Sequence, residues 1–452
     1  MRKIFVSFLA AAFFYSAAAA DVAVTVYNSG KSMVRETREI VLKKGLQTLE
    51  FDEVASQIDA TSVLPKFLND NANIKVLEQN FDYDLVGRDK LLSKYIGKKI
   101  EIERIGEDKR GKLKGTLLSV SGGLVVKTDD KIVLAPAGEV SLSEMPEGLR
   151  LKPTLTWLVS SGFEGKNAME VSYQTFGLSW SADYVLVTDE KDTQADIVGW
   201  VTINNKSGAT YKNANIKVIA GDVNIVSLNG NAELKGVRKA KMVYDAAPAP
   251  ASFSEKSFDE YHIYELQRKS TVKDNEVKQI EFITASQVDV KKVLKFNALK
   301  NNKITVNLEF KNSKENNLGV PLPKGRARVF KYDGASLEFV GEDNIDHTAN
   351  NAKLSIYTGN AFDVTGERRQ IERKQTSSKT VEESYKITLK NAKKEEVEVI
   401  VEENFDRWAL NWQISENSAK YEKTNSTTAE FKIKVPADGE AVLTYKVKYS
   451  WK

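Results

Sequence analysis

The chain has 452 residues, no cysteine, and 66 Lys and Arg against 62 Asp and Glu. A charge this close to balance argues against a dedicated nucleic-acid-binding protein, because such proteins concentrate basic residues on one face. The lack of cysteine excludes disulfides, a cysteine nucleophile and thiolate metal sites.

The first twenty residues have the pattern of an export signal. Arg2 and Lys3 precede an apolar stretch at residues 4–15, and Ala18 and Ala20 form an A-x-A pattern before the next residue. This order is typical of a secretory signal peptide. We therefore expect cleavage after Ala20 and a periplasmic or secreted protein. No later apolar run has the roughly twenty residues that a transmembrane helix needs.

Alternation of apolar and polar residues predicts an all-β protein with very little helix. It appears at residues 22–27 (VAVTVY), 169–175 (MEVSYQT) and 304–310 (ITVNLEF), among others. A period of two places one face of a strand in a core and the other in solvent. The best helix candidate is residues 84–96, followed by Gly97 as a possible C-cap.

Three further features divide the chain. Five short strand-like stretches between residues 98 and 149 indicate a small SH3-like or Sm-like barrel. The Pro- and Ala-rich stretch at residues 246–254 lies in a segment, about 230–260, without a sustained period, which favours a disordered loop or linker. Alternation at residues 431–435 and 441–451, around a turn at residues 437–440, predicts a terminal hairpin.

The expected organisation is therefore a multi-domain protein of β-sandwich units. We predict a signal peptide (1–20), an N-terminal β region (21–83), a short helix with the small barrel-like insert (84–150), a central β-sandwich region with the loop (151–380), and a C-terminal immunoglobulin-like sandwich (381–452).

One cluster of acids is a candidate for catalysis. Glu402, Glu403 and Asp406 lie beside Trp408 and Trp412. Glycoside hydrolysis needs two carboxyl groups at a set separation, and an aromatic floor suits a sugar ring. In a chain with 62 acidic residues such clusters arise by chance, and tryptophans in strands usually belong to the core. We expect no catalytic residue, with these three acids as the alternative.

Other motifs have ordinary interpretations. Residues 106–112 have P-loop spacing, but Leu113 stands where the motif requires Ser or Thr for Mg²⁺. A zinc site would need both histidines, His262 and His347, together with a carboxylate. The apolar strand context of His262 favours a hydrogen-bonded core residue instead, so we expect no metal and no cofactor. The basic run of Arg368, Arg369, Arg373 and Lys374 predicts one face of a long hairpin, with Glu382 and Glu383 opposite.

Two longer segments resemble a known family. The first includes residues 153–157 (PTLTW), 171–187 (VSYQTFGLSWSADYVLV) and 199–205 (GWVTINN), and the second includes 318–333 (LGVPLPKGRARVFKYD) and 361–369 (AFDVTGERR). In this order they resemble an uncharacterised family of exported bacterial proteins that is grouped with mucoidy inhibitor A-like proteins.

The resemblance implies β-sandwich units in an envelope protein, and it carries no catalytic residue to this chain. Its motif residues have structural interpretations: buried anchors for the aromatic ones, turns or bulges for the glycines, and a loop crossing for the prolines. They are Trp180, Tyr184, Gly177, Pro321, Pro323, His347, Gly366 and Arg368.

We therefore expect a non-enzymatic, exported envelope protein that binds or scaffolds a partner through its β-sheet surfaces. The expected partner is an envelope protein or a polysaccharide, not a nucleic acid, and a homo-oligomer is possible. Two alternatives remain: a self-assembling surface or secretion component, and a hydrolase of envelope polysaccharide. A cleft with two carboxyl groups would favour the hydrolase.

Overall fold

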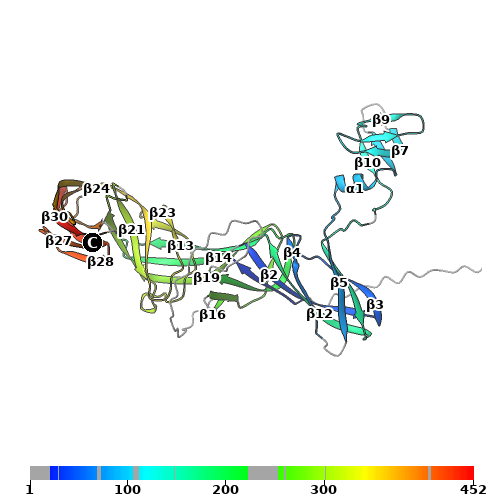
Figure 1. Cartoon of the computed structure of the whole chain (residues 1–452), viewed down its shortest axis with the longest axis horizontal. Helices are drawn as coiled ribbons and strands as arrows, with labels where there is room; N and C mark the ends of the chain where they lie inside the picture. The colour runs from blue at the N-terminus through cyan, green and yellow to red at the C-terminus, as the bar shows by residue number, and fades with distance from the viewer. Residues whose placement is uncertain are drawn as a thin grey trace, which may run out of the picture. The chain divides into compact units, whose positions relative to one another are not determined.

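The computed structural model describes residues 21–28, 30–68, 73–104, 111–146, 148–221, 253–258, 261–300, 302–405 and 409–451. These residues form β-strands almost throughout, as the alternating pattern predicted (Figure 1). The expected signal peptide and most of the expected loop at 230–260 lie outside them. In the part of the chain that is described, no helix is long and apolar enough to cross a membrane.

The chain divides into two compact units. The first contains the described residues within 1–179, 204–217 and 269–276, and the second contains those within 180–203, 218–268 and 277–452.

Two sheets of the first unit consist of alternating strands with one buried face. The larger has the order β15 (Tyr211–Ala220), β1 (Asp21–Tyr27), β2 (Lys31–Leu42), β12 (Gly165–Phe176) and β4 (Ile58–Phe67), with β18 (Ser270–Val272) against β15. The smaller has the order β3 (Gly45–Asp52), β11 (Thr154–Ser161) and β5 (Ile74–Asp82). Trp157 of β11 is fully buried and packs edge-to-face on Phe51 of β3, with ring centroids 6.1 Å apart.

The predicted barrel-like block forms an open sheet. Its order is β10 (Glu139–Ser141), β6 (Lys99–Arg104), β7 (Gly111–Ser119), β8 (Val125–Lys127) and β9 (Ile132–Leu134). The five strands are where the sequence placed them. Within the described residues the two end strands do not pair, so the barrel-like block is an open sheet and not a closed barrel. Each end strand has only three residues.

The helix of this block, α1 (Arg88–Lys94), is shorter than the predicted 84–96. Leu85 instead forms an isolated bridge with Arg150, which holds the start of the predicted helix in extended conformation. The helix contributes Leu92 to the core of the block, and Tyr95 at its end is also buried there.

The second unit begins with a hairpin and a mixed sheet. The hairpin is β16 (Phe253–Phe258) with β17 (Tyr261–Leu266). The sheet has the order β19 (Glu276–Asp289), β14 (Gln194–Asn205), β13 (Leu178–Thr188), β22 (Gly325–Tyr332) and β23 (Leu337–Ile345). The pair of β13 and β22 is parallel. A 3-10 turn, η2 (Lys314–Asn316), precedes β22.

The C-terminal part of this unit is a nine-stranded sheet that forms a sandwich around one core. Its order is β27 (Asn411–Ser415), β30 (Gly439–Ser450), β25 (Thr380–Asn391), β24 (Lys353–Ser377), β21 (Lys303–Lys311), β20 (Lys291–Phe296), β26 (Val397–Asn404), β29 (Thr428–Val435) and β28 (Tyr421–Asn425). Three of these strands precede residue 381, where the sequence placed the boundary of the last domain. We call this assembly the C-terminal sandwich.

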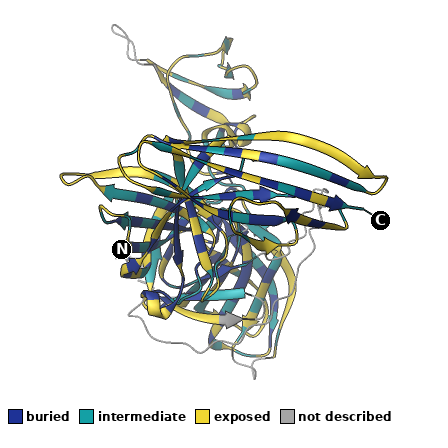
Figure 2. Cartoon of the chain, turned by 90° about the vertical axis from the view of Figure 1, so that its left-hand side faces the viewer, coloured by how far each residue is buried: buried dark blue, intermediate teal, exposed yellow. Residues whose placement is uncertain are grey.

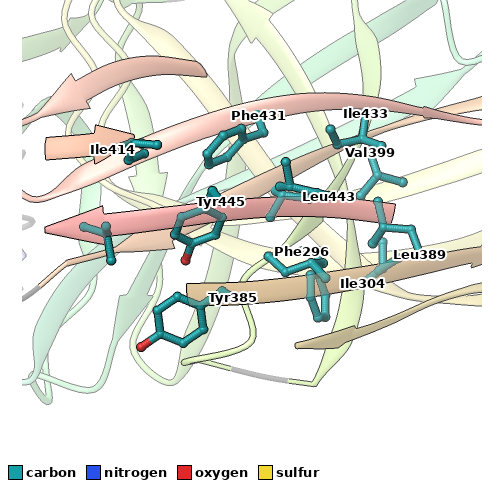
Figure 3. Close-up of a cluster of buried hydrophobic side chains, with 14 of the residues drawn as sticks. Phe296, Ile304, Tyr385, Leu389, Val399, Ile414, Phe431, Ile433, Leu443 and Tyr445 are labelled. Atoms are coloured by element: carbon teal, nitrogen blue, oxygen red, sulfur yellow. The ribbon is translucent and has the colours of Figure 1, made fainter. Parts of the chain in front are cut away.

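The predicted terminal hairpin was wrong in its pairing. β29 pairs with β26 and β28, whereas β30 pairs with β25 and β27. The rings of Phe431 in β29 and Tyr445 in β30 stack with centroids 5.5 Å apart inside the core (Figure 3). The residues between the two strands therefore connect opposite sides of the sandwich, because alternation identifies a buried face but not the neighbouring strand.

Candidate functional site

The two described acids of the candidate cluster point in opposite directions. Glu402 and Glu403 are neighbours in β26, and successive side chains of a strand lie on opposite faces. Glu402 accepts a hydrogen bond from Asn297 Nδ2 at 2.9 Å and pairs with Lys300 Nζ at 3.2 Å. Glu403 is 1% exposed, inside the sandwich. Asp406 and Trp408 lie outside the described residues. The geometry of Glu402 and Glu403 is not that of two carboxyl groups facing one sugar.

Glu403 is fully occupied by two partners from other strands. Arg368 of β24 donates from Nε to both carboxylate oxygens, at 3.1 and 3.0 Å, and its Nη2 lies 3.0 Å from Oε2. Tyr445 of β30 donates from its hydroxyl to Oε2 at 2.6 Å. A buried charge needs this degree of pairing to be tolerated. We call these three residues the buried pin, since they join strands from both sides of the sandwich.

The pin continues along the pair of β24 and β25. The Arg368 guanidinium lies over the ring of Tyr385, 3.7 Å from its centroid. The Tyr385 hydroxyl donates to Glu383 Oε2 at 2.6 Å, and Arg373 Nε lies 3.1 Å from Glu383 Oε1. Burial of Tyr385 raises its pKa to about 12. These contacts fix the conformation of the hairpin.

Buried tyrosines predict a loss of stability at high pH. Burial, followed by the nearby Glu403 charge, raises the pKa of Tyr445, and burial raises the pKa of Tyr184 and of Tyr264. The folded chain thus holds these protons more tightly than the unfolded chain does. Their stabilising effect is complete below the ordinary tyrosine pKa of about 10 and decreases as the pH rises above it.

The midpoint of thermal unfolding, measured from pH 8 to 11.5, should therefore fall steeply only above about pH 10. The fall should be shallower in the variant Tyr445→Phe, which has one fewer of these groups. A midpoint that is unchanged up to pH 11.5 would contradict the prediction.

The second half of β24 has an unpaired hydrogen-bonding edge. Up to Thr365, β24 pairs with β21, and residues 364–377 pair with β25. Among the described residues, β25 is the one strand that pairs with the part of β24 beyond Thr365. Every residue from 369 to 377 is exposed, and a long exposed strand is visible in Figure 2. We call residues 366–377 the β24 edge.

The predicted pairing of the basic run is confirmed. Arg373 is opposite Glu383 and Lys374 is opposite Glu382 in the register of β24 and β25. The run does not form one face, however. Arg368 is opposite the buried Ile387, on the core side, whereas the next residue is opposite the exposed Lys386. Strand alternation divides these cations between the two faces of the hairpin.

An exposed apolar patch on the hairpin of β22 and β23 was not anticipated. Tyr332 pairs with Leu337 and Phe330 pairs with Phe339, so the four side chains lie on one face. Phe339 is 56% exposed and contacts Phe330 edge-to-face. The period of two was visible in the sequence, but a strand with an apolar face normally indicates a buried one, so exposure could not be inferred from it.

The aromatic and proline motif residues act as internal supports of the second unit. Trp180 Nε1 donates to the carbonyl of Ile219, and the Tyr184 hydroxyl donates to the carbonyl of Pro323 at 2.7 Å. The Tyr264 hydroxyl donates to the carbonyl of Pro321. Trp180 and Tyr184 are both buried on one face of β13. These contacts anchor the proline-containing loop before β22.

The two glycines of the motifs serve different purposes. Gly177 lies between β12 and β13 with φ +78°, a conformation that favours glycine. Gly366 lies within β24, where an added Cβ would be 2.7 Å from the Phe296 ring, so glycine allows the strand to approach that ring.

The histidines are far from a ligand arrangement. His347 Nδ1 accepts a hydrogen bond from the backbone N–H of Lys324. His262 lies in β17 with its Nδ1 2.7 Å from Glu255 Oε1, and a third of its side chain is exposed, so it is not a core residue. Among the described residues, no group of three or more His, Asp or Glu side chains could hold a metal ion.

The comparisons with known proteins give a family but no activity. Residues 169–452 match the family model described as Domain of unknown function (DUF4139), and no curated protein matches the chain. The match includes the buried pin, the β24 edge and all strands of the C-terminal sandwich. It confirms the resemblance to an uncharacterised family. The match extends over more than half of the chain, and the chain therefore belongs to the family described as Domain of unknown function (DUF4139).

Proposed function

We propose that this chain is a non-enzymatic protein of the bacterial cell envelope, which binds a partner by strand addition at the β24 edge. The envelope location rests on the export pattern of residues 1–20. The grouping with mucoidy inhibitor A-like proteins rests on the order of the sequence motifs and is part of the same proposal. The observation that carries the binding function is the unpaired edge itself.

An unpaired strand edge offers a row of backbone N–H and C=O groups to an incoming strand. Folded proteins protect an edge that they do not use by keeping it short, by covering it, or by placing charged side chains and bulges on it. Here it continues over residues 366–377, and its side chains are exposed on both faces of the hairpin beyond Gln370. Addition of a strand would satisfy these backbone groups, as in other complexes formed by β-augmentation.

The buried pin makes this edge a preformed binding surface. Arg368, the third residue of the edge, is held by Glu403 and Tyr445 from two other strands. Its neighbour strand β25 is held in turn by β30 along its whole length. An edge that is already ordered loses less conformational entropy on binding than a flexible segment does. This supports recognition of a strand at a fixed register.

The alternative of a polysaccharide hydrolase receives less support from the same residues. Glu402 and Glu403 face opposite sides of β26, and Glu403 is buried and hydrogen-bonded to Arg368 and Tyr445. A glycosidase needs two carboxyl groups that converge on one bond.

Site-specific crosslinking in the cells that produce the protein tests the proposal. A photo-reactive amino acid at Ile371, on the β24 edge, should give reproducible adducts with a protein partner. The matched control is the same amino acid at Lys386, which is exposed but lies in β25 between β24 and β30. Adducts at neither position, or equally at both, would contradict binding at this edge.

A further inference from the structure

We infer that the strand bound at the β24 edge is the β24 edge of a second copy of this chain, in antiparallel orientation. The inference rests on the proposed function and adds the identity of the partner. It is carried by the charges on one face of the edge.

The outer face of the edge has side chains of alternating charge. In the register with β25, Arg369 is opposite Lys386 and Glu372 is opposite Ser384, and both of these β25 residues lie on the face away from the core. Glu367 and Lys374 occupy the next outer positions on either side. In chain order the outer face therefore reads acid, base, acid, base.

An irregularity in the strand is what places these four residues together. Residues 369 and 372 are three apart, so in a regular strand they would lie on opposite faces. The register shifts between Gln370 and Glu372, which makes Ile371 an extra residue. Because of this bulge, the side chain of Glu372 lies on the same face of the strand as that of Arg369. Ile371, 61% exposed, lies at the centre of the charged sequence.

Antiparallel pairing with a second copy matches these charges. When two edges meet about a twofold axis near Gln370 and Ile371, Glu367 of each copy is opposite Lys374 of the other. Arg369 of each copy is then opposite Glu372 of the other. Opposite charges in cross-strand pairs are stabilising, whereas like charges are destabilising. Parallel pairing in register would instead oppose like charges at every one of these positions.

The inner face does not oppose this arrangement. The same register brings Arg368 of one copy opposite Arg373 of the other. Arg368 is already neutralised by Glu403, and Arg373 is paired with Glu383 of its own copy. The resulting pair is symmetric and closed, because each β24 edge covers the other. It therefore predicts a dimer rather than a growing fibre.

Charge reversal tests the register directly. The oligomeric state of the purified full chain would be followed by size-exclusion chromatography with light scattering over a range of concentrations. Glu367→Lys alone and Lys374→Glu alone each create two like-charge pairs per dimer and should raise the dissociation constant roughly tenfold or more. The combined variant restores opposite charges and should return it to within about threefold of the original. Lys432→Glu changes the net charge as Lys374→Glu does, but Lys432 is an exposed residue of β29, which pairs with β26 and β28 and not with β24, so this variant should have no effect.

The absence of cysteine from the chain allows a second measurement. Under oxidising conditions Ile371→Cys, near the twofold axis, should give a disulfide-linked dimer, and Lys386→Cys should remain monomeric. A monomer at all concentrations, without a linked dimer of the Ile371→Cys variant, would overturn self-pairing. Adducts from Ile371 to a different protein would then leave the proposed function in place. If the edge gives no adduct at all, both proposals fail.

Discussion

Replacing Glu403 by glutamine should lower the unfolding free energy of the C-terminal sandwich by about 3–5 kcal/mol. Glutamine keeps the shape of the side chain but removes its charge. The Arg368 guanidinium would then remain largely buried, with 15% of its side chain exposed, and without a counter-ion. Removing one partner of a buried pair costs more than the pair itself contributes, because the other charge stays behind.

The neighbouring residue provides a matched control. Glu402→Gln makes the same chemical change one residue earlier in β26, on the opposite face. Its partner Lys300 is 70% exposed, so the ion pair is screened by water. The expected loss is below about 1 kcal/mol. Because the chain has several units and need not unfold in one step, the opening free energy should be measured by hydrogen exchange in β26 and β30.

A double variant separates charge from packing. In Arg368→Met with Glu403→Leu, both charges are removed together and the volume is largely kept, so most of the loss seen for Glu403→Gln should disappear. If Glu402→Gln and Glu403→Gln destabilise equally, the buried pin has no special role. In that case the fixed register of the β24 edge would need another explanation.

The buried pin illustrates which part of the site the sequence could predict. Alternation in β26 already implies that Glu402 and Glu403 lie on opposite faces, and the basic run correctly predicted its pairing with Glu382 and Glu383. The contact of Arg368 with Glu403 joins residues 35 apart in the chain, from strands that are not neighbours in the sheet. Nothing in local spacing indicates such a pair, since it depends on how the sheet folds over its core.

The same distinction explains the errors in the fold. Local patterns identified the strands, because period two depends only on which face is buried. They did not identify strand neighbours: residues 431–435 and 441–451 alternate as a hairpin would, yet β29 and β30 lie on opposite sides of the core. An unpaired edge is likewise a property of the complete sheet. The β24 edge becomes recognisable only when β21 is seen to end opposite Thr365.

Gly325→Ala should destabilise the mixed sheet of the second unit by about 1–3 kcal/mol or more. Gly325 opens β22 and is the first residue paired with β13 in parallel, opposite Ala182. A Cβ at this position would be 2.1 Å from the Ala182 carbonyl oxygen and 2.7 Å from its carbon. These are backbone atoms within a sheet, so they cannot move aside as the end of a side chain would.

The shift of β22 that relieves this clash would also disturb the charges beside it. Asp183 follows Ala182 on β13 and lies 3.4 Å from Arg326 Nη2 and 3.6 Å from Arg328 Nη1. With Asp183 only 8% exposed, lengthening these contacts would leave a largely buried carboxylate with weaker partners. The cost therefore includes a polar part as well as the steric one.

A glycine in another strand serves as the control. It shows the effect of adding a methyl group to a strand where no other backbone lies close. Gly111, the first residue of β7, has no atom of the described residues within 4 Å of an added Cβ. Gly111→Ala should change stability by no more than about 0.5 kcal/mol, because alanine also reduces the entropy of the unfolded chain. Hydrogen exchange measures the change in opening free energy, in β13 and β22 for Gly325→Ala and in β6 and β7 for Gly111→Ala. An opening free energy that Gly325→Ala leaves unchanged would mean that β22 can move away from β13 at no cost.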